Sequence, residues 1–133
     1  MISATGILAR NSPSFVRTAF QCYAARERFV PLLPGSAVAE ATGVRIDKIL
    51  EPDASTGWFD EAHPVLFEDT EAQINFTSGT EGWPKGIILS HRALADTVSR
   101  LNAVMELDGS VREYVGVPAF YSFGLGRFRA CAD

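Results

Sequence analysis

Residues 5–33 read TGILARNSPSFVRTAFQCYAARERFVPLL, and this stretch decides the fold class. It begins with a short apolar run at 5–9 and ends with a second one at 29–33, and both runs are typical of buried strands. Between them, Ser12 is a favourable helix N-cap and Pro13 suits the first helical position. A strand, a helix and a second strand in this order form a βαβ unit. The sequence therefore predicts an α/β protein built in layers on a parallel sheet.

The predicted helix has one apolar face. Its apolar residues recur at helical spacing, which predicts that this face packs against the sheet. These residues are Val16, Ala19, Phe20, Tyr23 and Ala24.

The rest of the chain is also predicted to contain both strands and helices. Further predicted elements are strands at 44–50, 73–77, 86–90 and 113–118, a short helix at 36–42 closed by Gly43, and a helix at 91–107 capped by Ser90. Leu94, Val98, Leu101 and Met105 form the apolar face of the later helix, and Gly109 is placed to end it. Residues 51–64 and 119–126 are expected to be loops, and no closing element is predicted beyond them.

Composition excludes several classes of protein. The chain has 133 residues, 47% of them apolar, which is enough for one domain with a core. A net charge of −4 argues against nucleic-acid binding. Cys22 and Cys131 lie in no metal-binding spacing and are expected to be reduced thiols. With no signal-peptide pattern and no long apolar run, we expect a cytoplasmic protein without a membrane span.

Residues 76–86, FTSGTEGWPKG, are rich in the residue types that bind phosphate. Phosphate sites need inward-pointing backbone N–H groups, small residues, hydroxyl groups and a cation. The segment from Thr77 to Lys85 offers all four features, through Gly79 and Gly82, the hydroxyl residues Thr77, Ser78 and Thr80, and Lys85. A plain hairpin turn between 73–77 and 86–90 explains the composition equally well. Neither a Walker A loop nor a Rossmann glycine fingerprint is present.

A family resemblance favours phosphate. Residues 74–86, INFTSGTEGWPKG, resemble the signature of the AMP-forming adenylating enzymes, which include acyl-CoA synthetases, luciferases and peptide-synthetase adenylation domains. The βαβ stretch, ILSHRAL at 88–94 and VPAFYSFGLG at 117–126 are similar to further family segments. Tyr121 stands where the family usually has His. The resemblance is weakest over 36–68.

The resemblance implies an activity in two steps. ATP and a carboxylate give an acyl-adenylate and pyrophosphate, and a thiol of coenzyme A or of an acyl or peptidyl carrier protein then accepts the acyl group. ATP and Mg²⁺ are the implied cofactors. Residues 1–133 would be part of the large N-terminal domain. The family's adenine and ribose motifs, and its C-terminal domain with the catalytic Lys, are not in this sequence, so we expect the first part of such an enzyme.

The resemblance also assigns residues to roles. Lys85 and Thr80 are the implied catalytic residues, and no protein metal ligand is implied. The implied phosphate-binding residues are Thr77, Ser78, Gly79, Thr80, Glu81, Gly82 and Lys85. The implied substrate pocket contains Tyr121, Phe123 and Gly124.

Some assignments have alternatives. Tyr121 and Phe123 fit a pocket wall or plain core equally well. Glu81 could orient magnesium, but a tolerant loop position is favoured. For His91 a first-turn helix position is favoured over a catalytic base. The substrate is expected to be a fatty or aryl acid. The alternatives at the level of the chain are a non-catalytic remnant that binds phosphate and an unrelated interaction module.

Overall fold

A computed structural model of the chain describes residues 2–35, 42–52, 69–80 and 82–132. Its sheet has the strand order β3-β1-β2-β4-β5. The strands are β1 (Ile2–Leu8), β2 (Phe29–Leu32), β3 (Val44–Leu50), β4 (Glu71–Phe76) and β5 (Gly86–Ser90). β1 runs parallel to β2 and β3, and β2 runs parallel to β4. β5 pairs antiparallel with β4, so the predicted parallel sheet carries one antiparallel edge strand.

The predicted βαβ unit is confirmed. Helix α1 (Pro13–Ala24) connects the parallel strands β1 and β2. It begins as the sequence predicts, because the Ser12 hydroxyl accepts a hydrogen bond from the backbone N–H of Phe15 at 3.3 Å. The predicted apolar face is buried except for Ala24, which is exposed.

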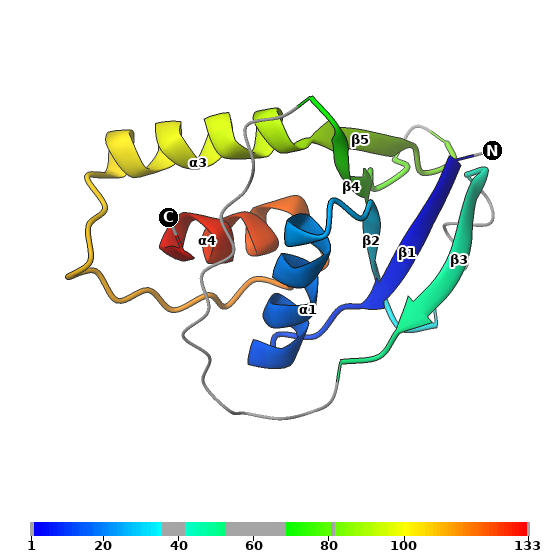
Figure 1. Ribbon diagram of the computed structural model, residues 1–133, viewed down its shortest axis with the longest axis horizontal. Coiled ribbons are helices and arrows are strands. Elements are labelled where there is room, and N and C mark those ends of the chain that lie inside the picture. The colour runs from blue at the N-terminus through cyan, green and yellow to red at the C-terminus, as the bar shows by residue number, and fades with distance from the viewer. Residues whose placement is uncertain (1, 36–41, 53–68, 81, 133) are drawn as a thin grey trace.

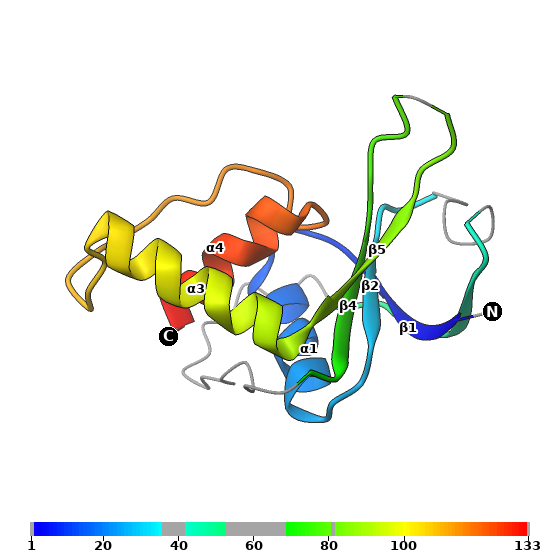
Figure 2. The ribbon, with the colours of Figure 1, turned by 90° about the horizontal axis from the view of Figure 1, so that it is seen from above.

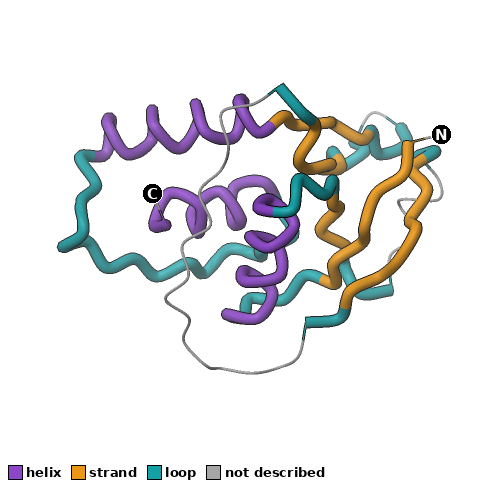
Figure 3. Tube along the Cα trace, in the orientation of Figure 1, coloured by secondary structure: helices purple, strands orange, loops and turns teal. Residues whose placement is uncertain are grey.

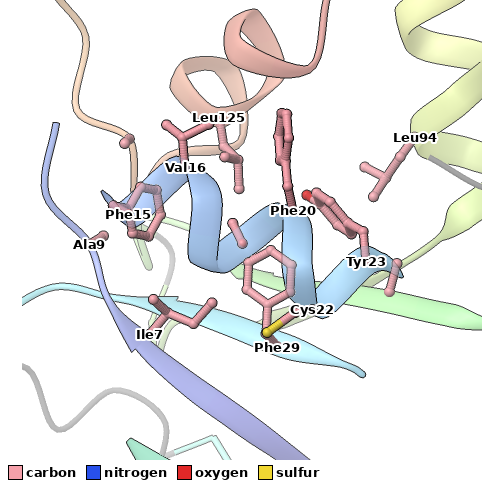
Figure 4. Packing of buried hydrophobic residues seen from close by; sticks show 13 residues of the cluster. Ile7, Ala9, Phe15, Val16, Phe20, Cys22, Tyr23, Phe29, Leu94 and Leu125 are labelled. Atoms are coloured by element: carbon pink, nitrogen blue, oxygen red, sulfur yellow. The ribbon is translucent and has the colours of Figure 1, made fainter. Parts of the chain in front are cut away.

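Helices α1, α3 (His91–Met105) and α4 (Ser122–Ala132) all lie on one side of the sheet (Figures 1 and 2). The tube view shows the same division, with helices on one side and strands on the other (Figure 3). The main core fills the space between them. Figure 4 shows Ile7 and Phe29 approaching α1 from the strands, while Leu125 of α4 and Leu94 of α3 approach from the helices.

Helix α3 also begins where predicted. The Ser90 hydroxyl accepts from the backbone N–H of Ala93 at 3.2 Å. Leu94 and Val98 are buried, whereas Met105 at the far end is half exposed. The predicted end at Gly109 is wrong, because Glu106 adopts a left-handed conformation with φ of 51° and ends the helix there.

Two predictions near the end of the chain are wrong. Residues 113–118 form no strand, and the predicted loop at 119–126 gives way at Ser122 to helix α4. The side chain of Asn11 bonds the backbone of Val117 and Ala119 at 2.9 and 2.8 Å, so these peptide groups are fixed by a side chain and not by a strand. Helix α4 therefore closes the core that the sequence left open.

Some predictions lie outside the described residues. The helix expected at 36–42 and the loop expected at 51–64 fall there for most of their length. Within the described residues, no helix is long and apolar enough to cross a membrane. Both thiols are free, and burial raises the pKa of the Cys22 thiol to about 11, so this thiol stays protonated.

Candidate functional site

The segment 77–85 joins β4 to β5 and protrudes beyond the end of the sheet (Figure 2). Phe76 and Gly86 pair across the two strands directly below it. The hairpin interpretation is therefore correct as topology. The segment also follows the carboxyl end of β4, which is where ligands bind in open α/β sheets. A hairpin connection and a phosphate loop are compatible here.

Two hydrogen bonds close the base of the loop. The backbone N–H of Thr77 donates to the Lys85 carbonyl at 3.0 Å, and the N–H of Lys85 donates to the Thr77 hydroxyl oxygen at 3.0 Å. The Thr77 hydroxyl thus holds the loop shut and keeps its own hydrogen to donate. Lys85 is fixed at its backbone while its side chain remains exposed.

The turn of the loop requires glycine. Gly79 has a φ of +69°, and a Cβ atom there would lie 2.8 Å from the carbonyl oxygen of Gly82. The N–H of Gly82 donates to the Gly79 carbonyl at 3.0 Å, across a turn in which Gly82 has a φ of +136°. Because the chain passes so close to itself, any side chain at 79 would open the turn.

The loop leaves donors unused. Among the described residues, no hydrogen bond engages the backbone N–H of Ser78, Gly79 or Thr80. Ser78, Thr80 and Lys85 are exposed, so hydroxyl groups and an ammonium group surround these N–H groups. Such a set suits the oxygens of a phosphate chain. Glu81 lies outside the described residues.

The donor set fits a chain of phosphate groups better than it fits a bare metal ion. Within the described part of the chain, no three His, Cys, Asp or Glu side chains cluster to hold a metal. Mg²⁺ commonly binds proteins through substrate phosphates and water.

The predicted substrate-pocket residues lie at the start of α4. Tyr121 and Phe123 are 56% and 64% exposed, so the core interpretation does not hold for them. Gly124 is buried, and a Cβ atom there would lie 2.4 Å from the Pro118 carbonyl oxygen. Gly124 thus lets the first turn of α4 sit against the preceding chain.

The two parts of the candidate site lie at the same edge of the sheet. The loop follows the carboxyl end of β4, and Asn11, which follows β1, holds residues 117–119. β2 lies between β1 and β4, which separates the two strands by about 10 Å. Within the described residues, no hydrogen bond links the loop to Tyr121 or Phe123.

His91 belongs to the core. It is the first residue of α3, it is fully buried, and its ring meets Tyr23 edge-on at 6.0 Å between centroids. The favoured interpretation as a helix residue is confirmed. A side chain enclosed in this way has no access to a substrate.

Sequence reasoning missed the buried charges of α4. Arg127 is 4% exposed and forms two bonds to Glu113, each 2.6 Å long. Its guanidinium lowers the pKa of the Glu113 carboxyl. Arg129 is also 4% exposed and bonds to Tyr23 and Gln73. No local pattern indicates these partners, because they lie far away in sequence.

An open groove of about 490 Å³ lies at the opposite edge of the sheet, near the amino ends of the strands. Its charged groups are already paired, Arg28 with Glu71 and Glu27 with Lys48. Hydrogen bonds from Lys48 and Thr5 lower the pKa of Glu27. Because the opposite charges of an ion pair largely cancel, they attract a charged ligand only weakly. We therefore assign no site to this groove.

Comparison with known proteins decides the family. The family model described as AMP-binding enzyme matches residues 36–131. This chain belongs to the AMP-binding enzyme family. The resemblance of the loop signature is thereby confirmed.

Two known proteins are similar in sequence to this member of the AMP-binding enzyme family. YngI of Bacillus subtilis, a candidate acyl-CoA synthetase, is 30% identical over 77 residues, which cover 58% of this chain and 14% of YngI. The nonribosomal peptide synthetase GRA1 of Gibberella zeae is 30% identical over 94 residues, which cover 71% of this chain and 1% of GRA1. The chain thus spans only a small part of these relatives.

Solved structures show the same fold for this AMP-binding enzyme chain. The inhibitor-bound N-terminal domain of FACL13 from Mycobacterium tuberculosis superposes with a TM-score of 0.74 at 16% identity. The match covers 98% of this chain and 42% of that domain. A structure from a study of fatty acyl-adenylate ligases gives a TM-score of 0.68. The described fold therefore corresponds to part of the fold of an acyl-adenylate ligase N-terminal domain.

Proposed function

We propose that this chain supplies the pyrophosphate-binding part of an enzyme that activates a carboxylic acid with ATP. The observation that carries the proposal is the closed loop at 77–85, with unused N–H groups at Ser78, Gly79 and Thr80 and the exposed ammonium of Lys85. Membership of the AMP-binding enzyme family supports the nucleotide as ligand. Residues 1–133 then form part of the N-terminal domain of the enzyme.

The proposed chemistry places negative charge at the loop. The carboxylate attacks the α-phosphorus of ATP, and the bond to the departing pyrophosphate breaks. Donors of the loop, chiefly Lys85 and Thr80, stabilise the charge that builds on the pyrophosphate. The glycines at 79 and 82 let the backbone approach its oxygens. Mg²⁺ would supply further neutralisation of this charge.

The acid is proposed to be a fatty or aryl acid. The exposed rings of Tyr121 and Phe123 lie at the same sheet edge as the loop and offer an apolar wall. The thiol acceptor is proposed to be coenzyme A or a carrier protein. Similarity to both a candidate acyl-CoA synthetase and a nonribosomal peptide synthetase supports keeping both acceptors.

Binding of Mg²⁺-pyrophosphate, measured by titration calorimetry, tests the proposal. Lys85→Ala should weaken binding by about 10- to 100-fold, because a hydrogen bond to a charged group contributes about 1.5–3 kcal/mol. Lys48→Ala removes an exposed lysine from the other edge of the sheet and is the matched control. Equal affinities for the parent chain and Lys85→Ala would contradict the proposal and favour an interaction module.

ATP–pyrophosphate exchange with fatty, aryl and amino acids then tests turnover. Exchange with one acid would show that this chain completes adenylation and would name the class of acid. Binding of pyrophosphate without exchange supports the second candidate, a chain that binds phosphate without catalysis. That candidate is favoured by the unused N–H groups of Ser78, Gly79 and Thr80, which can bind phosphate oxygens without a catalytic step.

A further inference from the structure

A chain of buried polar side chains runs from α4 to the strand below the loop. Arg129 donates from Nη1 to the Tyr23 hydroxyl at 2.8 Å and to Oε1 of Gln73 at 3.1 Å. The Tyr23 hydroxyl donates to the same Gln73 oxygen. Nε2 of Gln73 donates to Oδ1 of Asn75. Tyr23 and Gln73 are fully buried, so water does not compete for these bonds.

Arg129 fixes the direction of every bond in this chain. A guanidinium has donors and no acceptor. Gln73 must therefore turn its oxygen toward Arg129 and Tyr23, which leaves its NH₂ group for Asn75. Asn75 must then accept with its own oxygen. The NH₂ group of Asn75 is consequently directed away from the chain.

The Asn75 NH₂ group has no partner among the described residues, and Asn75 is only half buried. Asn75 stands two positions before Thr77, which closes the loop. Gln73 and Asn75 are two apart on β4, so they share one face of the sheet, which Gln73 turns toward Tyr23 of α1. The unused amide thus stands at the base of the loop, on the side of the sheet that faces the helices.

Resting on the proposed function, we propose that Asn75 is a further binding residue, whose NH₂ group donates to an oxygen of the bound phosphate chain. Arg129 is the positioning residue that holds this NH₂ group toward the ligand. An amide that was free to rotate would present its oxygen half of the time, and an oxygen repels an anion. The buried charge of Arg129 removes that alternative.

The test is the affinity for Mg²⁺-pyrophosphate of two variants with equal net charge. Asn75→Asp still accepts from Gln73 and so keeps the relay, but it places an anionic oxygen toward the ligand. Ile88→Asp adds the same charge on β5. It is paired with Ile74, whose side chain belongs to the cluster on the opposite face of the sheet. We expect Asn75→Asp to weaken binding at least about 10-fold and Ile88→Asp less than about 3-fold.

A second pair of variants tests the positioning role. Arg129→Lys keeps a cation that can only donate, whereas Arg129→Met lets Gln73 and Asn75 rotate. Binding should weaken several-fold in Arg129→Met and recover in Arg129→Lys, with thermal melts recorded for both. A merely structural role would lower the melting temperature without this recovery of affinity.

The outcomes separate two failures. Equal weakening by Asn75→Asp and Ile88→Asp, with a large loss in Lys85→Ala, would overturn this inference and leave the proposed function standing. No binding of pyrophosphate by the parent chain would overturn both.

Discussion

The loop at 77–85 and helix α4 hold their shapes in opposite ways. The loop is exposed, and backbone bonds at its base and two glycines shape it. Helix α4 is fixed by buried side chains, including Leu125, Arg127 and Arg129. Charge in the loop stays hydrated and available to a ligand, whereas charge in α4 is consumed by internal partners. We infer that side chains of the loop contact the ligand, whereas the buried side chains of α4 serve stability and, at Arg129, the positioning of Asn75.

Among the variants that test this difference between the loop and α4, Leu125→Ala should have the largest effect. Leu125 is fully buried between α4 and α1, so its truncation should cost about 2–5 kcal/mol of the free energy of unfolding. Urea denaturation measures the loss. A change below about 1 kcal/mol would mean that α4 is not docked on the core as described.

Glu113→Gln should be the next largest change. It removes the charge that pairs with the buried Arg127 guanidinium and should cost about 1–3 kcal/mol. Asp96→Asn breaks an exposed pair with Arg100 and is the control, with an expected change below about 0.5 kcal/mol. Similar losses in both variants would show that the burial of Arg127 is unimportant.

The ion pair between Glu113 and Arg127 predicts that the stability of the folded chain depends on pH. The Arg127 guanidinium lowers the pKa of Glu113 in the folded chain below its ordinary value of 4.5. The stabilisation is therefore fully present when the pH is above the ordinary pKa. It is lost as the pH falls through the lowered pKa of the folded chain. Melting temperatures of the parent and Glu113→Gln should converge as the pH decreases from about 6 through the lowered pKa of Glu113. Parallel curves would contradict the pair.

Gly79→Ala should have a moderate effect that is confined to the loop. The positive φ of residue 79 and the contact of its new Cβ atom with the Gly82 carbonyl should destabilise the native loop conformation by about 1–3 kcal/mol. Pyrophosphate binding should weaken as a result. Gly109→Ala is the control, because Gly109 has no positive φ and a Cβ atom there meets nothing within 4 Å. An affinity at parent level in Gly79→Ala would show that ligand binding does not need this turn.

Lys85→Ala should have the smallest effect on stability. Its side chain is exposed, so the free energy of unfolding should change by less than about 0.5 kcal/mol while the affinity for pyrophosphate falls. Chemical denaturation and calorimetry on the same sample measure both. A large loss of stability would contradict the inference that side chains of the loop, unlike those of α4, do not stabilise the fold.

Local patterns explain what the sequence could predict. The caps at Ser12 and Ser90, the apolar face of α1 and the glycines of the loop all act within a few residues, so they are visible in the chain itself. The fold class and the βαβ unit were predicted for this reason, whereas the loop was assigned to phosphate only through its family resemblance.

Helix α4 was missed because distant residues determine it. Arg129 meets Tyr23 across 106 positions, and Asn11 meets Val117 across the same separation. Gly124 and Gly126 disfavour a helix by propensity, yet Gly124 is needed because the Pro118 carbonyl lies where its Cβ would be. Such close contacts leave no periodic signal in a single sequence.

The central claim is that the loop at 77–85 binds the phosphate chain of ATP. The most direct measurement is the change in backbone amide NMR shifts of the 133-residue chain on addition of Mg²⁺-pyrophosphate. The largest and saturable shifts should fall on Ser78, Gly79 and Thr80, whose N–H groups have no internal acceptor among the described residues. Saturable shifts that cluster instead around Arg26 and Arg28 in the opposite groove, or no saturable shifts, would contradict it.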